Sequence, residues 1–269
     1  MTTLTLFHNT YRCTGADAES AADLVLLHGW GLHSIVWDDI MPGLLQHFRV
    51  TVIDLPGMGQ SPMPAGDYTL DYLADHVAAI LPRQCHLMGW SLGGLVALKL
   101  ASERPQQVLS LTMVASTPKF VADGDWPGVE ARLFDRFMEV FEEDVEGTLI
   151  RFLALNCKDA STVRDDVRKL KEILYFCGLP APRALRGGLS VLRDTDLREA
   201  LSEMSMPCLL LFGEYDNIVP TATAELLTVR HQVRVLADVS HVPFVSLPEQ
   251  FLQLLRQGWC DLGIIAEQS

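Results

Sequence analysis

The stretch GWSLGG, residues 89–94, places one serine between glycines where an apolar run gives way to a helical pattern. The preceding residues Cys85–Met88 predict a short buried strand, and Leu92–Glu103 have helical apolar spacing that stops before Pro105. The glycines permit a sharp strand-to-helix turn, which forces position 91 into strained backbone geometry with its hydroxyl exposed. Ser91 is therefore a candidate nucleophile, although an ordinary loop or a helix-capping serine also fits the pattern.

A carboxylate and a histidine follow Ser91 along the chain, each shortly after a predicted apolar strand. Asp216 comes after residues Leu209–Phe212, and His241 comes after residues Val233–Leu236. Because the carboxyl ends of parallel strands lie along one edge of a sheet, Ser91, Asp216 and His241 can meet there despite their separation in sequence. These three residues are the predicted catalytic group.

The chemistry of a serine nucleophile assigns a role to each of these side chains. A serine hydroxyl is a poor nucleophile at neutral pH, so we expect His241 to accept the proton of Ser91 and to return it to the leaving group. We expect Asp216 to hold the imidazole tautomer and to stabilise the imidazolium. Glu214 is a competing acid two residues earlier, but the spacing after the strand favours Asp216.

A second glycine-containing loop is the candidate for stabilising the negative oxygen of a tetrahedral intermediate. An apolar strand runs into the loop HGWG at residues 28–31, and His28 is expected to shape this loop by hydrogen bonding. The backbone N–H groups of Trp30 and of Leu92, the residue after the nucleophile, are the predicted oxyanion donors. The side chains of Trp30, Leu92 and Trp90 are expected to wall an acyl pocket, although simple core packing also explains Trp30.

Five segments resemble the α/β-hydrolase superfamily over nearly the whole chain: residues 28–31 (HGWG), 54–57 (DLPG), 89–94 (GWSLGG), 213–216 (GEYD) and 241–244 (HVPF). The resemblance implies an α/β-hydrolase fold, in which helices flank a mostly parallel central sheet and a helical cap is inserted between strands. More closely, the chain is similar to the pimeloyl-[acyl-carrier protein] methyl ester esterases of biotin synthesis. That similarity depends on the tryptophans at 30 and 90 and on residues 151–155 (RFLAL), 187–189 (GGL), 196–198 (DLR) and 205–207 (SMP).

The narrower similarity implies a serine carboxylesterase that removes the methyl ester of pimeloyl-acyl-carrier protein as methanol, with acyl-carrier protein as the partner that carries the substrate. Trp30, Leu92 and Phe152 match positions that contact substrate in that family, and Trp90 and His241 are expected to join them. The preferred acyl length and an absolute need for the carrier are left open. The alternative is a general short-chain carboxylesterase, or a lyase or carbon–carbon hydrolase that uses the same catalytic residues on a small molecule. A ligand-binding module on the same fold is a third class.

Three arginines of the predicted cap match positions that face the carrier in the same family: Arg151, Arg164 and Arg168. Gly147 stands where a further cap arginine is expected, which weakens this part of the resemblance. Met58 replaces a histidine often found beside the DLPG loop, and this departure is expected to be neutral.

Charge is distributed unevenly along the chain. The net charge is −13, yet residues 147–193 contain nine basic and four acidic residues, which give that segment a charge of +5. Arg164, Arg168 and Lys171 fall on neighbouring turns of one helical face, which predicts a positive patch that attracts an acidic carrier. The alternative is a solvated helix face on which these cations pair with nearby acidic residues, namely Asp165, Asp166 and Glu172.

Length and periodicity predict one α/β domain with an insertion. A chain of 269 residues with 49% hydrophobic residues can bury a single large core. The predicted core comprises residues 1–117 and 194–269, and the predicted cap, or lid, comprises residues 118–193. The cap is expected to be helical because apolar residues recur there at helical spacing, at positions 163, 167, 170 and 174. Strands are expected near residues 3–7, 24–27, 50–53, 85–88 and 109–114, besides the two that precede the catalytic acid and histidine.

Composition and spacing disfavour several other classes. The acidic total and the lack of a basic stripe with interleaved aromatics argue against nucleic acid. No metal and no cofactor are predicted, because no cluster has metal-ligand spacing and no dinucleotide-binding glycine motif occurs. The six cysteines form no close pair and are expected to be reduced, and no apolar run is long enough to span a bilayer. With no secretory signal at its start, the chain is expected to be cytoplasmic and not to bind membranes. A monomer is expected, although the sequence leaves the oligomeric state open.

Overall fold

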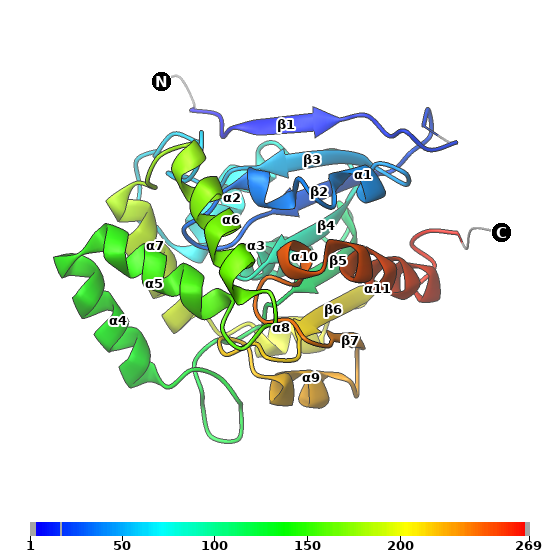
Figure 1. The fold of residues 1–269 in the computed structure, drawn as a ribbon. Coiled ribbons are helices and arrows are strands. Elements are labelled where there is room, and N and C mark those ends of the chain that lie inside the picture. Colours follow the sequence, from blue (N-terminus) through cyan, green and yellow to red (C-terminus); the bar gives the residue numbers. More distant parts are fainter. Residues whose placement is uncertain (1–3, 17, 267–269) are drawn as a thin grey trace.

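A seven-stranded sheet runs through the computed structural model, which describes residues 4–16 and 18–266 (Figure 1). Its strands are His8–Tyr11 (β1), Asp23–Leu27 (β2), Arg49–Ile53 (β3), Cys85–Trp90 (β4), Val108–Val114 (β5), Cys208–Gly213 (β6) and Gln232–Leu236 (β7). The spatial order is β1-β3-β2-β4-β5-β6-β7. β1 pairs antiparallel with β3, and the other neighbouring strands pair in parallel, so the sheet is mostly parallel.

The prediction for the first strand is wrong. The sequence places it near residues 3–7, of which residue 3 lies outside the described residues, whereas β1 begins at His8. All four residues of β1 are exposed, so this edge strand has no buried apolar alternation that would reveal it in the sequence. The apolar residues that suggested a strand belong to the segment before it, where Leu6 packs into the core.

The other six predicted strands are confirmed. Parallel strands covered by helices on both faces are apolar along their whole length, and β2 illustrates this, since Leu24–Leu27 are all at most 1% exposed. The same burial extends through β6, where every residue from Cys208 to Gly213 is buried. Because burial on both faces requires apolar side chains, such strands appear in the sequence as continuous apolar runs.

Helices cover both faces of the sheet (Figure 1). Outside residues 118–193 they are Ser34–Trp37 (η1), Met41–Leu44 (α1), Leu70–Ala78 (α2), Leu92–Glu103 (α3), Arg198–Ser202 (α8), Thr221–Leu227 (α9), Pro243–Ser246 (α10) and Pro248–Asp261 (α11). The indole of Trp259 in α11 donates to Thr112 of β5 at 2.9 Å, which fixes α11 on the sheet. Within residues 4–16 and 18–266, no helix combines the length and apolar character needed to cross a bilayer.

Four further helices lie at the end of the sheet toward which the parallel strands point (Figure 1). They are Ala131–Glu143 (α4), Val145–Asn156 (α5), Val163–Phe176 (α6) and Pro182–Asp194 (α7). The predicted helical character of residues 118–193 is confirmed. Leu170 and Leu174 of α6 are fully buried, as their helical spacing predicts. These helices therefore cover the edge at which the loops after β2, β4, β6 and β7 emerge.

Candidate active site

Ser91 lies at the sharp turn between β4 and α3, in a backbone conformation that residues with side chains rarely adopt. Its φ of 53° and ψ of −118° are strained, and the surrounding packing must hold them. A Cβ added at Gly89 would lie 2.2 Å from the carbonyl oxygen of Gly93, and one added at Gly93 would lie 2.3 Å from that of Leu27. The turn therefore requires glycine at both positions.

His241 and Asp216 form a buried pair on the loops that follow β7 and β6. The Nδ1 atom of His241 lies 2.8 Å from Oδ2 of Asp216, and both side chains are fully buried. The other carboxylate oxygen of Asp216 accepts from the backbone N–H groups of Ile218 at 2.8 Å and Val219 at 2.9 Å. These bonds aim the carboxylate at the imidazole, and a proton on Nδ1 leaves the lone pair of Nε2 to act as a base.

The structure separates the two acids that compete in the sequence. Glu214 is exposed and accepts from the backbone N–H of Asp238 at 3.1 Å, so at the surface it links the loop after β6 to the loop after β7. Asp216 is the acid that the fold brings to His241.

The backbone of His241 is held from two sides. Its N–H donates to the carbonyl oxygen of Asn156 at 2.9 Å, and its carbonyl oxygen accepts from the indole of Trp90 at 2.8 Å. Because Trp90 directly precedes Ser91, the second bond links the histidine loop to the nucleophile turn. Among the described residues, Nε2 of His241 has no hydrogen-bond partner, Ser91 included. Hydrogen bonds of this kind are often long in a free enzyme and shorten in the complex with substrate.

The loop after β2 packs directly against the nucleophile turn. A Cβ on Gly93 would collide with the carbonyl oxygens of Leu27 and His28, so the two segments touch through their backbones. Leu92 begins α3, and its N–H is therefore one of those that have no acceptor inside the helix. The two predicted oxyanion donors, the amides of Trp30 and Leu92, thus belong to segments that meet beside Ser91.

His28 fixes the conformation of that loop, as predicted. Its Nδ1 lies 2.8 Å from the carbonyl oxygen of Gly29, and its Nε2 accepts from the backbone N–H of Leu55 at 2.9 Å. Burial lowers the pKa of His28 to about 4, so the ring is neutral at pH 7. Its Nε2 therefore keeps the lone pair that accepts the hydrogen bond from the N–H of Leu55.

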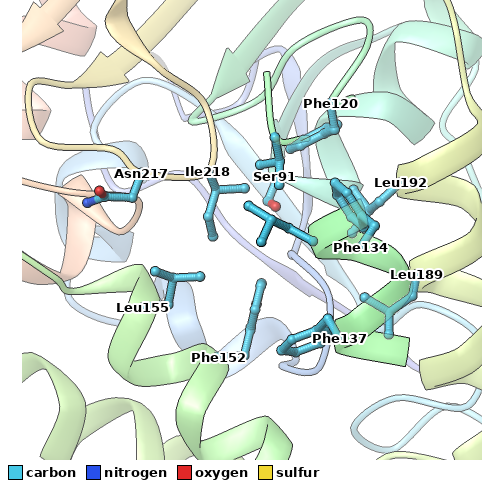
Figure 2. Close-up of a pocket in the computed structure, with 12 residues that line it drawn as sticks. Ser91, Phe120, Phe134, Phe137, Phe152, Leu155, Leu189, Leu192, Asn217 and Ile218 are labelled. Carbon is cyan, nitrogen blue, oxygen red and sulfur yellow. The ribbon is translucent and has the colours of Figure 1, made fainter. Parts of the chain in front are cut away.

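Ser91 opens into a cavity of about 390 Å³ between the edge of the sheet and helices α4, α5 and α7. Figure 2 shows the Ser91 hydroxyl among the lining side chains, with Asn217 and Leu155 toward one end and Leu189 and Leu192 toward the other. This volume is within the range of small-molecule sites, about 300–1,000 Å³. Among the described residues, the lining side chains other than Ser91 and Asn217 are apolar: Phe120, Val129, Leu133, Phe134, Phe137, Phe152, Leu155, Leu189, Leu192 and Ile218.

The predicted substrate-binding side chains divide into those that line this cavity and those that lie behind it. Phe152 lines it. The ring of Trp30 lies 4.9 Å from that of Phe152 and 5.9 Å from that of Phe137, between centroids, and its indole donates to the carbonyl oxygen of Leu185 at 2.8 Å. Trp30 therefore supports the wall from behind, as the core-packing alternative suggests. The other predicted side chains are also fully buried outside the cavity lining: Trp90, Leu92 and His241.

The three predicted carrier-binding arginines lie exposed on α5 and α6. Arg151 pairs with Asp144 at 3.6 Å and Arg168 pairs with Asp165 at 2.9 Å, whereas Arg164 projects from the first turn of α6. Exposed ion pairs stabilise a fold by only about 0–1 kcal/mol, so Arg151 and Arg168 can exchange their partners at little cost.

Most of the cavity wall was missed by sequence reasoning. Helix α4 contributes Leu133, Phe134 and Phe137, whose three-to-four-residue spacing was an available signal of an apolar helix face. Asn217 and Ile218 follow the catalytic acid directly, but nothing in their identity marked them as lining residues.

The parallel sheet, the glycine-flanked serine turn, and the order of serine, acid and histidine along the chain are those of an α/β hydrolase. The model of the "Alpha/beta hydrolase family" matches residues 24–254. The chain belongs to this family and, within it, to the group of the pimeloyl-[acyl-carrier protein] methyl ester esterases.

Relatives with that name are similar over most of their length. The one from Aeromonas hydrophila is 44% identical over 239 residues, which cover 87% of this chain and 94% of the relative. The one from Sodalis glossinidius is 43% identical over 245 residues, which cover 90% and 93%. Among solved structures, a hydrolase from Pseudomonas aeruginosa superposes with a TM-score of 0.77 at 26% identity, covering 93% of this chain and 92% of that one. An esterase from Exiguobacterium antarcticum superposes with a TM-score of 0.82 at 20% identity, covering 94% of each chain. At this identity the similarity supports the fold alone.

Proposed function

We propose that this chain is a serine esterase that hydrolyses the methyl ester of pimeloyl-acyl-carrier protein to the free acid and methanol. The observation that carries the proposal is the position of Ser91, which is held in a strained turn and opens into an apolar cavity. Such a cavity suits the methylene chain of an acyl group. The similarity to esterases named for this substrate supports the same choice.

The first half of the reaction acylates the serine. Nε2 of His241 takes the proton of the Ser91 hydroxyl as its oxygen attacks the ester carbonyl. The amides of Trp30 and Leu92 donate to the resulting oxyanion, and Asp216 stabilises the imidazolium. The tetrahedral intermediate collapses when His241 gives its proton to the methoxy oxygen, so that methanol leaves and an acyl ester remains on Ser91.

The second half returns the serine to its free state. Water attacks the acyl ester and gives a proton to His241, through a second tetrahedral intermediate at the same amides. That proton returns to Ser91 when the carbon–oxygen bond breaks, and the free carboxylate leaves. The sum is one ester and one water converted to one acid and one methanol. An apolar wall disfavours the new carboxylate, which promotes its release.

We propose further that residues 118–193 act as a cap that contributes the cavity wall inside and the carrier surface outside. Helices α4, α5 and α7 supply most of the lining, which supports the first role. The exposed Arg151, Arg164 and Arg168 support the second role, because acyl-carrier proteins are acidic and their prosthetic group contains a phosphate.

The cell compartment and the assembly state also belong to the proposal. All six cysteines are free, which suits the reducing cytosol. One chain contributes Ser91, Asp216, His241 and the cavity lining, so a monomer is sufficient for the reaction.

Genetic complementation tests the function most directly. The gene should restore growth without biotin to a strain that lacks its methyl esterase, and the Ser91→Ala variant should not. In vitro, Ser91→Ala should lower kcat on a p-nitrophenyl ester by about 10⁴-fold or more. Good hydrolysis of simple esters without complementation would favour a general carboxylesterase. Retained activity in Ser91→Ala would refute the nucleophile.

A further inference from the structure

His33 connects the loop after β2 to the end of helix α6, 140 residues away in sequence. Its Nε2 lies 2.7 Å from the carbonyl oxygen of Ile173, and its Nδ1 lies 4.0 Å from Sγ of Cys177. A carbonyl only accepts, so Nε2 carries the proton and donates it. His33 as a whole is 2% exposed, which means that this bond is shielded from water.

The acceptor is a group that the helix itself leaves unpaired. Ile173 lies in the last turn of α6, where the final four carbonyl oxygens have no N–H partner within the helix. A histidine donor at this end satisfies one of them and interacts favourably with the helix dipole. His33 thus caps α6 from a residue outside the helix.

The same loop is linked to the cap at a second point and to the core on its other side. The indole of Trp30 donates to the carbonyl oxygen of Leu185 in α7 at 2.8 Å. On the core side, the backbone N–H of Ser34 donates to Oδ1 of Asp54 at 2.7 Å. The segment that carries the Trp30 amide is therefore held between the sheet and the cap.

Helix α5 makes a comparable bond to the catalytic histidine. Its last residue is Asn156, whose carbonyl oxygen accepts from the backbone N–H of His241 at 2.9 Å. Each of α5, α6 and α7 therefore gives one carbonyl oxygen to a donor on a loop of the active site. Packing alone would not require three such bonds to fall on these loops.

We propose that His33 is a positioning residue, which holds the oxyanion amide of Trp30 in place by fixing its loop to α6 of the cap. The proposal rests on the proposed function for the roles of Ser91 and Trp30. His33 is outside the cavity lining and touches no reacting atom, so it acts through the loop. The cap then has a catalytic effect besides forming a wall.

The expected effect follows from the geometry of an oxyanion hole. Donors act when they lie about 2.7–3.1 Å from the developing oxyanion, and loss of one donor lowers kcat by about 10²–10³-fold. A loosened donor should cost less than a missing one. We therefore expect loss of the His33 donor to lower kcat by about 10- to 100-fold and to change KM by less than about twofold.

Three variants separate positioning from packing. His33→Leu fills the space without an N–H group, and His33→Gln places an amide N–H at a similar reach. The matched control is His76→Leu, because Nδ1 of His76 lies 2.8 Å from the carbonyl oxygen of Tyr72 in α2, outside the site. The assay is hydrolysis of p-nitrophenyl acetate, together with inhibition by an alkylboronic acid that forms a tetrahedral adduct with the serine. Because no carrier is involved, an error in the proposed natural substrate does not affect the result.

We expect His33→Leu to lose kcat and boronic acid affinity in parallel, and His33→Gln to recover kcat to within about threefold of the unaltered protein. His76→Leu should lose thermal stability without losing kcat. The proposal is overturned if His33→Leu keeps full kcat, or if His33→Gln folds and is as slow as His33→Leu.

A measurement on the unaltered protein covers the case in which His33→Leu does not fold. Paraoxon, which phosphorylates a serine nucleophile, should slow amide hydrogen exchange in residues 29–34 and also in residues 173–178. Helix α6 contributes none of the described residues that line the cavity, so its response must pass through another segment. Slower exchange in residues 29–34 alone would show that the loop and α6 are not coupled, and would overturn the proposal.

Discussion

The nucleophile turn and the cap helices face the same cavity, but they are built under different constraints. At the turn, a single added carbon on Gly93 would lie 2.3 Å from the backbone oxygen of Leu27, and backbone atoms cannot move aside as easily as the end of a flexible side chain. In the cap, Phe137 and Phe152 contribute rings to the wall, and side chains can change without altering the chain path. Backbone geometry therefore determines the chemistry, whereas cap side chains determine which molecules reach it.

The largest effect should come from breaking the proton relay on the core side. Asp216→Asn should lower kcat by about 10⁴-fold, because an amide no longer stabilises the imidazolium or the required tautomer. Glu214→Gln is the matched control, since this acid bonds the neighbouring loop and should leave kcat within about twofold. Steady-state kinetics on a p-nitrophenyl ester measures both. If both variants lost kcat equally, Glu214 would again be a candidate for the catalytic acid.

The next largest effect should come from adding one carbon to the turn. Gly93→Ala forces the turn away from Leu27, and we expect kcat to fall by at least about 100-fold, with a loss of about 1–3 kcal/mol in the free energy of unfolding. Gly124→Ala has open space but a φ of +58°, so it should lose about 1 kcal/mol and keep its activity. Urea unfolding and kinetics on the same samples separate the two effects. Full activity in Gly93→Ala would contradict the conclusion that the turn requires glycine at position 93.

These two regions also differ in how far the sequence predicted them. The turn was predictable because its geometry is local: glycines adjacent to Ser91 mark a conformation that the neighbouring residues alone require. The loop of Asp216 was predictable because β6 is fully buried and apolar, and parallel strands end at one edge. The edge strand β7, which precedes His241, is only partly buried and contains Arg234, but its remaining residues Val233, Val235 and Leu236 still predict a strand. The exposed edge strand β1 has no such apolar signal.

The cap was predictable as helical but not as a binding wall. Which face of α4 meets the cavity depends on contacts with residues far away in sequence, such as Trp30 against Phe137 at 5.9 Å between ring centroids. The link from His33 to Ile173 spans 140 residues, and no local pattern encodes it. Its place in the helix sequence makes Asp166 a candidate surface partner for the cap cations, yet this residue is buried and accepts from Ser246 of the core at 2.6 Å.

An intermediate effect should come from opening the cap wall. Phe137→Ala removes a ring that packs against Phe152 at 5.8 Å, which should leave room for longer acyl chains. We expect the ratio of kcat/KM for octanoate to that for acetate p-nitrophenyl esters to rise about tenfold, with kcat on acetate little changed. Phe176→Ala is the matched control, because this ring lies on α6 and is 74% exposed. An unchanged ratio in Phe137→Ala would mean that cap side chains do not determine acyl selectivity.

The smallest effect should come from the outer face of the cap. The double variant Arg164→Glu/Arg168→Glu should raise KM for a carrier-linked ester by about 3- to 10-fold, because an acidic carrier is no longer attracted, and should leave small esters unaffected. The increase should shrink as salt is added, since exposed charges are screened.

Charge reversal also changes the whole protein, so the control must match it. Arg132→Glu/Arg136→Glu makes the same change in net charge on α4, within the same cap, and both arginines are exposed. If only the α6 variant raises KM for the carrier-linked ester, the carrier binds that face of the cap. If both pairs raise KM equally, the carrier responds to total charge, and the specific surface on α6 is refuted. If KM for p-nitrophenyl acetate also rises in the α6 variant, the reversal has disturbed the cavity itself, and the separation between an inner wall and an outer docking face no longer holds.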